Sequence, residues 1–155
     1  MRRGKIWRQA NPTNPAFTPE TSPFFHLSRL TGLYHLRMDA HLKPIGMDVP
    51  RWRVLNILYE HECAPISTIA DLAVIRMPTM TKLIYRMEGE GLVSTRVSAK
   101  DGRVTEVSLT EKGHAGVDQV RVKAGLIFER AFHDIEDGEI EAFMKIMKKI
   151  YDNIY

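Results

Sequence analysis

Apolar residues recur at helical spacing over the first half of the chain. Between residues 24 and 42 polar and charged residues separate them, and this period predicts a helix with a broad apolar face that ends at the Pro-Ile-Gly stretch 44–46. A second, shorter helix is predicted to start near Pro50, because proline suits a first helical position. The residues expected to face inward are Leu27, Leu30, Leu33, Tyr34 and Met38 in the first helix, and Trp52, Leu55, Leu58 and Tyr59 in the second.

Two further short helices, joined by a tight turn, are predicted between residues 68 and 91. Thr68 and Asp71 have the spacing of a capping box, so we expect a helix to start there, after a break at 61–65, and to use Leu72 and Ala73 for its apolar face. Pro78 opens the next helix, and the glycines at 89 and 91 end it. Its inner side is predicted to be Met80, Leu83, Ile84 and Met87, and its outer side Thr79, Lys82 and Arg86.

A hairpin and two helices complete the pattern. Residues 92–97 alternate imperfectly, Asp101-Gly102 is a strong hairpin signal, and residues 103–109 form the return strand. Thr110 and Glu111 then cap a helix, and a last helix spans about 137–151. Their expected apolar sides are Val117, Val120, Leu126, Ile127 and Phe128, then Ile140, Phe143, Ile146, Met147 and Ile150. A helix-turn-helix followed by a basic hairpin predicts a mainly α fold, an α+β winged helix.

The N-terminal segment differs from the rest. Residues 1–23 contain prolines at 12, 15, 19 and 23, which predict an extended basic arm, either a loosely ordered tail or an arm that reaches DNA or a partner subunit. We expect residues 24–155 to form a single domain, in which a winged helix-turn-helix at about 48–112 is flanked by dimerisation helices at about 24–42 and 111–152.

Composition agrees with an ordinary globular chain of 155 residues, about one domain long. No apolar run approaches the ~18 residues that a membrane span requires, and the first ten residues lack the apolar stretch of a secretory signal. The single Cys63 cannot form an intramolecular disulfide, which fits a reducing compartment. The sequence therefore predicts a soluble cytoplasmic protein with no membrane partner.

Charge is distributed unevenly along the chain, although its net value of +3 is only mildly basic. Basic residues stand without acids at the N-terminus and gather in the middle, whereas acidic residues gather late. This separation favours one face built for an anionic polymer. The groups are Arg2, Arg3, Lys5 and Arg8; then Arg76, Lys82, Arg86, Arg96, Lys100 and Arg103; and finally Asp134, Glu136, Asp137, Glu139 and Glu141.

From residue 24 onward the chain resembles the MarR family of bacterial winged helix-turn-helix transcription regulators. The motifs that carry the resemblance are Ile69-Ala70-Asp71-Leu72-Ala73, residues 79–87, Glu90-Gly91-Leu92-Val93, Arg96, Asp101-x-Arg103 and Ser108-Leu109-Thr110-Glu111-Lys112-Gly113. Two positions depart from the family pattern: Pro78 stands where a small polar residue is usual, and Gly102 where a charged wing residue is frequent.

The expected DNA-contacting residues lie on the second helix of the motif and on the wing. A helix fits the major groove, so Thr79 and Lys82, early on the outer face, are expected to read base edges. Arg76, Arg86 and Thr81 are expected to contact phosphates, which position the protein without specifying sequence. Lys100 lies at the wing tip. The resemblance implies that Asp101 orients Arg103, which enters or borders the minor groove.

Dimerisation and ligand binding follow from the same resemblance and from the apolar faces. One recognition helix reads only a few base pairs, so we expect a homodimer on a pseudo-palindromic operator with half-sites ~34 Å apart. The resemblance implies a repressor that a small aromatic acid or its thioester releases from DNA. The polar and aromatic candidates for this ligand are Arg29, Tyr34, His35, Arg37, His41, Trp52 and Arg53.

Other functions have weaker support in the sequence. No glycine-rich phosphate loop, nucleophile elbow or His-Glu-x-x-His motif is present, so no enzyme and no cofactor is predicted. Redox sensing by Cys63 and metal binding by His41, His61 and Cys63 are alternatives, but no histidine pair sits one helical turn apart. Two other hypotheses are an architectural DNA-binding protein that responds to no ligand and a winged helix that makes protein contacts.

Overall fold

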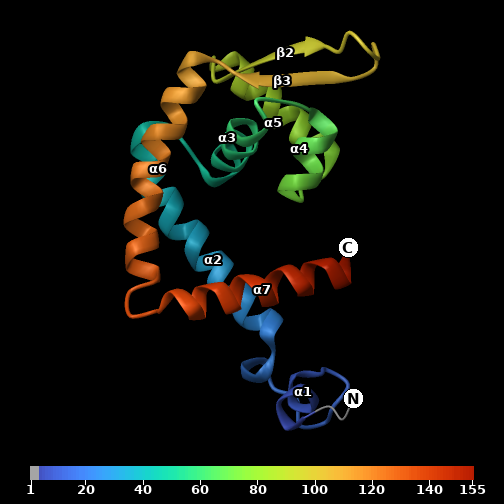
Figure 1. Cartoon of the computed structure of the whole chain (residues 1–155), viewed down its shortest axis with the longest axis vertical. Helices are drawn as coiled ribbons and strands as arrows, with labels where there is room; N and C mark the ends of the chain where they lie inside the picture. Colours follow the sequence, from blue (N-terminus) through green and yellow to red (C-terminus); the bar gives the residue numbers. More distant parts are fainter. Residues whose placement is uncertain (1–3) are drawn as a thin grey trace.

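The computed structural model describes residues 4–155, so Arg2 and Arg3 of the predicted basic arm lie outside the described residues. Figure 1 shows the helix-turn-helix and its hairpin at one end of the molecule, with α7 crossing below them and the N-terminal segment beyond it. The elements are α1 (Lys5–Ala10), the 3-10 helix η1 (Pro19–Thr21), α2 (Pro23–Leu42), the 3-10 helix η2 (Lys43–Ile45), α3 (Val49–His61), β1 (Cys63–Pro65), α4 (Ile66–Ala73), α5 (Met77–Gly89), β2 (Val93–Val97), β3 (Thr105–Leu109), α6 (Glu111–Ala131) and α7 (Asp137–Ile154).

A small antiparallel sheet supports the hairpin. Its strand order is β1-β3-β2, with Val93 opposite Leu109 and Cys63 opposite Ser108. The predicted break at 61–65 is therefore wrong in part, because Cys63–Pro65 forms the third strand. A three-residue strand carries too little alternation to be recognised, and its partner lies more than forty residues away in sequence. The helices with this sheet confirm the winged-helix fold class.

The core lies between α3, α4, α5, the sheet and the first half of α6. The predicted inner side of α5 is confirmed, since Met80, Leu83, Ile84 and Met87 are all buried. They pack with buried residues of the neighbouring elements, so α5 is held from one side over most of its length. These neighbours are Val54, Leu55, Leu58, Ile66, Ile69, Ala70, Leu92, Val93, Val107, Val117 and Val120.

The predicted start of α4 is wrong, and its predicted apolar face is right for Ala73 but wrong for Leu72. The helix begins at Ile66, after Pro65, so Thr68 lies inside its first turn and does not form a capping box. Leu72 is 51% exposed, whereas Ile66, Ile69, Ala70 and Ala73 are buried. The reason is that β1 pairs with β3 and leads the chain into the helix at Ile66, before the position of the capping signal. The core contacts of α4 then leave Leu72 on the outer side.

The turn between α4 and α5 contains a strained residue. Val74 adopts left-handed backbone angles, φ 52° and ψ 48°, and its side chain is 75% exposed. Such angles are unfavourable for a β-branched residue, at a cost of about 1–3 kcal/mol. The packing of α4 and α5 against one core therefore imposes this turn on a residue that does not prefer it.

The N-terminal segment is more structured than the expected extended arm. Lys5–Ala10 forms the short helix α1, and Pro19–Thr21 forms η1. The prolines begin only at position 12, so their effect on the backbone does not reach α1. Thr21 joins the two pieces, because its hydroxyl donates to the carbonyl of Gln9 at 2.7 Å.

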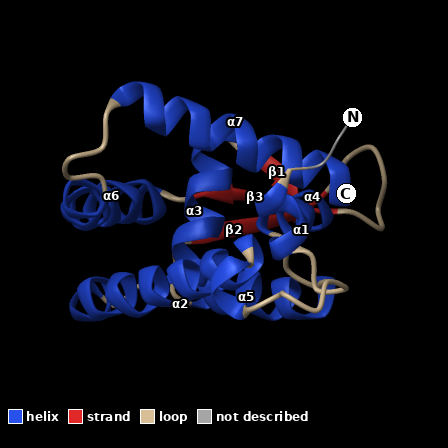
Figure 2. Cartoon of the chain, turned by 90° about the horizontal axis from the view of Figure 1, so that it is seen from below, coloured by secondary structure: helices blue, strands red, loops and turns tan. Residues whose placement is uncertain are grey.

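Three long helices leave much of their apolar surface uncovered. Helices α2 and α6 lie side by side, and α2 and α7 run along opposite edges of the molecule in Figure 2. Of the inward positions predicted for α2 only Met38 is buried, and α7 has no buried residue at all. The exposed apolar residues on these helices include Phe24, Leu30, Leu33, Leu36, Leu126, Phe128, Phe143, Met144, Ile146 and Ile154.

The total surface of the chain is correspondingly large. Its accessible area is 11590 Å², whereas a compact monomer of 17.8 kDa would expose about 8,000 Å². The excess, roughly 3,600 Å² for one chain, is at least as large as the roughly 1,000–2,500 Å² that each partner contributes to most obligate interfaces. A single chain therefore exposes much more surface than a compact monomer of the same mass.

Gly113 offers a test of how α6 docks on the sheet. A Cβ at this position would lie 2.1 Å from the backbone oxygen of Leu92, whereas one at Gly89, at the end of α5, would meet nothing within 4 Å. We expect Gly113→Ala to lower the free energy of unfolding by at least about 2 kcal/mol through this backbone clash. Gly89→Ala should be neutral or stabilising by about 0.5 kcal/mol, as alanine favours helix. Urea unfolding of both variants measures this, and equal stability of the two would contradict the described docking.

Candidate nucleic-acid interface

The outer face of α5 carries the side chains predicted to meet DNA. Arg76 is the residue before the helix, and its side chain makes no capping hydrogen bond. Thr79 and Lys82 are exposed in the first two turns, and Thr81 is half-buried between them. Tyr85, which the sequence reasoning did not select, is also exposed on this helix. Because Met80, Leu83, Ile84 and Met87 are buried, the opposite, polar face of α5 is the one exposed to solvent.

The wing presents an oriented arginine at its tip. Arg103 donates from Nε to Asp101 Oδ1 at 3.1 Å and from Nη2 to Oδ2 at 3.0 Å, and its backbone N–H donates to the same Oδ1 at 2.9 Å. The Arg103 side chain is nevertheless 91% exposed. The geometry thus matches the predicted pairing of Asp101 with Arg103. Lys100 is exposed on the same tip.

The wing is tied to α5 and braced internally by carboxylates that sequence reasoning missed. Glu88 of α5 accepts from the backbone N–H and the hydroxyl of Thr95, at 2.8 and 2.6 Å. Glu106 of β3 accepts from Arg96 Nε and from Ser98 Oγ, both at 2.9 Å. These hydrogen bonds lower the pKa of Glu106. The partners in these hydrogen bonds are seven to ten positions apart in sequence, so no local motif predicts them.

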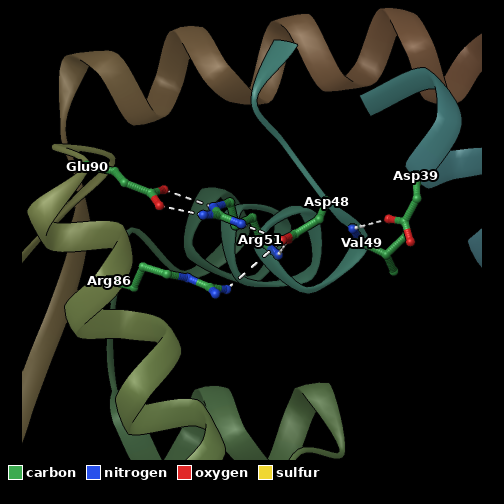
Figure 3. A network of polar contacts seen from close by, with 6 residues as sticks. All are labelled: Asp39, Asp48, Val49, Arg51, Arg86 and Glu90. Carbon is green, nitrogen blue, oxygen red and sulfur yellow. Dashed lines mark hydrogen bonds and ion pairs between the residues drawn. The ribbon is translucent and has the colours of Figure 1, made fainter. Parts of the chain in front are cut away.

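A second polar network joins α3 to the end of α5 (Figure 3). Arg51 donates from Nε to Glu90 Oε2 at 2.8 Å, from Nη2 to Glu90 Oε1, and from Nη1 to Asp48 Oδ2. Arg86 Nη2 lies 4.0 Å from the same Asp48 oxygen. The hydrogen bond from Arg51 lowers the pKa of Glu90, so the stabilisation it supplies is complete above the ordinary glutamate pKa and is lost as the pH falls through the lowered value.

The predicted ligand residues are only partly brought together. Arg53 Nη2 donates to His35 Nε2 at 2.9 Å, and the ring of Tyr34 lies 5.7 Å from that of His35. These three residues form one cluster between α2 and α3. Trp52 is half-buried against the core. Arg29 instead covers the Phe25 ring, and His41 Nδ1 bonds the carbonyl of Arg37, so these side chains are engaged elsewhere on α2.

Two open grooves involve the C-terminal helix. One of about 450 Å³ lies between Leu27 and α7, and its lining includes Met144, Met147 and Ile154. Another of about 780 Å³ lies between the end of α7 and the α4–α5 turn. None of the ligand residues predicted from the sequence lines either groove.

Cys63 and the histidines show no metal centre in the described chain. Cys63 Sγ lies 3.9 Å from Glu106 Oε2 and 3.9 Å from Arg96 Nη2, at the base of the wing. Within residues 4–155 no group of three or more histidine, cysteine or acidic side chains is arranged to hold a metal ion. Across the same residues, no helix combines the length and the apolarity needed to cross a membrane.

This fold and this surface define a winged helix-turn-helix DNA-binding protein. The sequence model of the MarR family matches residues 47–105. The HTH-type transcriptional repressor IacR of Pseudomonas putida is 36% identical over 144 residues, 93% of this chain and 86% of that protein. The chain therefore belongs to the MarR family, whose members are DNA-binding transcription factors and not enzymes.

Solved structures agree with this assignment. A MarR-family transcriptional regulator from Silicibacter pomeroyi is 25% identical, with a TM-score of 0.80 over 89% of this chain and 93% of that chain. CouR from Rhodococcus jostii RHA1, solved with p-coumaroyl-CoA bound, is 22% identical, with a TM-score of 0.78 over 86% of this chain and 94% of that one. The second likeness shows the fold alone.

Proposed function

We propose that this protein is a ligand-responsive repressor that binds a pseudo-palindromic operator as a homodimer. The observation that carries the proposal is the wing tip, where Asp101 orients the exposed guanidinium of Arg103. An arginine held in this way loses less conformational entropy when it enters a groove. The 36% identical relative carries the name of a repressor, which supports repression.

Base reading is assigned to the first two turns of α5. Thr79 and Lys82 are exposed there, on a helix whose opposite side is fixed by the core. Lysine donates to the acceptors of guanine in the major groove, and threonine pairs with several bases. Arg76, Thr81, Arg86 and Lys100 surround this face and are assigned to phosphates.

A homodimer is supported by the uncovered faces of α2, α6 and α7. Their exposed leucine, isoleucine and phenylalanine side chains account for the large surface of the single chain. Contact between two such faces would remove apolar area from water and place two recognition helices about a two-fold axis. The dimer therefore supplies both stability and two half-site contacts.

The ligand class is proposed from the cluster at α2 and α3. Arg53 and His35 offer cationic or hydrogen-bonding groups beside the aromatic ring of Tyr34. Such a combination suits an aromatic carboxylate or its acyl-thioester. CouR, a protein of the same fold, was solved with an aromatic acyl-thioester, p-coumaroyl-CoA. Ligand binding beside α3 would shift the packing behind α5.

Arg103 gives the direct test of the wing. We expect Arg103→Ala to weaken operator binding by about 1–3 kcal/mol and to reduce the salt slope of log K by about one. Titration of labelled operator at several salt concentrations measures both quantities. Lys145→Ala, which removes an exposed charge from α7, is the matched control and should bind as the wild type does. If Arg103→Ala bound the operator with unchanged affinity, the role assigned to Arg103 in DNA binding would be wrong.

The ligand class is tested by thermal unfolding with aromatic acids, their CoA thioesters and their neutral amides. We expect an acid or thioester at about 100 times its Kd to stabilise the protein by about 2.7 kcal/mol, and the amides to have no effect. Arg53→Gln should abolish the shift, while Lys145→Ala should retain it. No shift with any acid or thioester would overturn the proposed ligand class.

A further inference from the structure

The end of the recognition helix is held by an arginine whose guanidinium is fully engaged. Arg51 faces Glu90 with two nitrogens and Asp48 with the third, and its side chain is only 14% exposed. The planar guanidinium fork matches a carboxylate in two parallel hydrogen bonds, which fixes orientation as well as distance. Figure 3 shows the pair bridging α3 and the chain directly after α5.

Glu90 also contacts α6 through its backbone. Its backbone carbonyl accepts a hydrogen bond from Lys112 Nζ of α6 at 2.7 Å. Glu90 therefore connects three helices: it caps α5, binds Arg51 of α3 and meets Lys112 of α6. A change in its carboxylate would free the C-terminal end of α5 from α3 while the apolar core behind the helix stays intact.

Asp48 extends the network to a residue assigned to DNA. Its Oδ1 caps α3 by accepting from the Arg51 backbone N–H at 2.8 Å, and its Oδ2 faces both Arg51 and Arg86. The Arg86 side chain is 54% exposed. Asp48 thus gives the Arg86 guanidinium an anionic neighbour before any phosphate is present, which limits the directions in which this long side chain points.

We propose that Glu90, together with Asp48, is a positioning residue for DNA binding, which acts through Arg51 and Arg86 on the C-terminal end of α5. The inference rests on the proposed use of α5 as the recognition helix. It predicts that removal of the Glu90 carboxylate weakens operator binding. By charge alone, removing an acidic residue beside a DNA-binding helix reduces repulsion of the phosphates and tightens binding. If Glu90 positions α5, its removal instead weakens operator binding, because the end of the helix is no longer fixed.

The experiment compares Glu90→Gln, Asp48→Asn and Arg51→Lys with the wild type on the operator and on unrelated DNA. Glutamine and asparagine keep the side-chain shape, and asparagine also keeps the helix cap. Lysine keeps the charge of Arg51 but loses the bidentate fork. We expect each variant to bind the operator about tenfold more weakly, as for loss of one charged hydrogen bond, and unrelated DNA as the wild type does.

The salt dependence separates positioning from direct contact. Glu90→Gln should keep the wild-type slope of log K against log salt, because it removes no phosphate contact, whereas Arg86→Gln should reduce the slope by about one. Asp118→Asn, which removes an exposed acid from α6, is the matched control and should keep wild-type operator affinity. Thermal unfolding and size-exclusion chromatography of each variant monitor the fold and the oligomer.

The outcomes are distinct. Wild-type or tighter operator binding by Glu90→Gln and Arg51→Lys would overturn the positioning role while leaving the proposed function intact. Equal loss for operator and unrelated DNA, with a lowered unfolding temperature, would show a merely structural role and overturn it too. Failure of the wild type itself to prefer any operator would instead overturn the proposed function.

Discussion

The ion pair between Arg51 and Glu90 sets the geometry on which the DNA-facing side depends. The apolar core fixes which side of α5 is buried, but side chains of similar shape tolerate small rotations of a helix. The bidentate pair removes that freedom at the end of α5. Asp39 of α2 adds a link at the start of α3, where its Oδ1 accepts from the Val49 N–H at 3.1 Å. A polar path therefore runs from α2 through α3 to the recognition helix.

The second constraint is the surface that one chain leaves uncovered. Helix α7 buries none of its residues within the chain, yet isoleucine, methionine and phenylalanine recur along it at helical spacing. Such a helix is stable only when another surface covers its apolar face. In the proposed homodimer, α2 would link the subunit contact to the DNA-binding unit, since it both bears an uncovered face and packs on α3. A ligand between them would act on both.

Sequence reasoning succeeded where the signal was local and periodic. The inner side of α5, the Thr110 cap and the Asp101–Arg103 pair all arise from residues a few positions apart. It failed at β1 and at the start of α4, because pairing with β3 overrode a local capping signal. It could not find Arg51 with Glu90, or Glu88 with Thr95, because folding alone brings these residues together. The roles assigned to individual DNA and ligand residues remain proposals.

Sequence-specific binding is tested by incubating the purified protein with fragmented genomic DNA near physiological salt and sequencing the fragments that it retains. We expect enrichment of a few sites with two-fold symmetry and half-sites about one helical turn apart. Uniform retention of all fragments, fading as salt is added, would show backbone binding without sequence recognition. That result would contradict a specific repressor and favour an architectural DNA-binding protein.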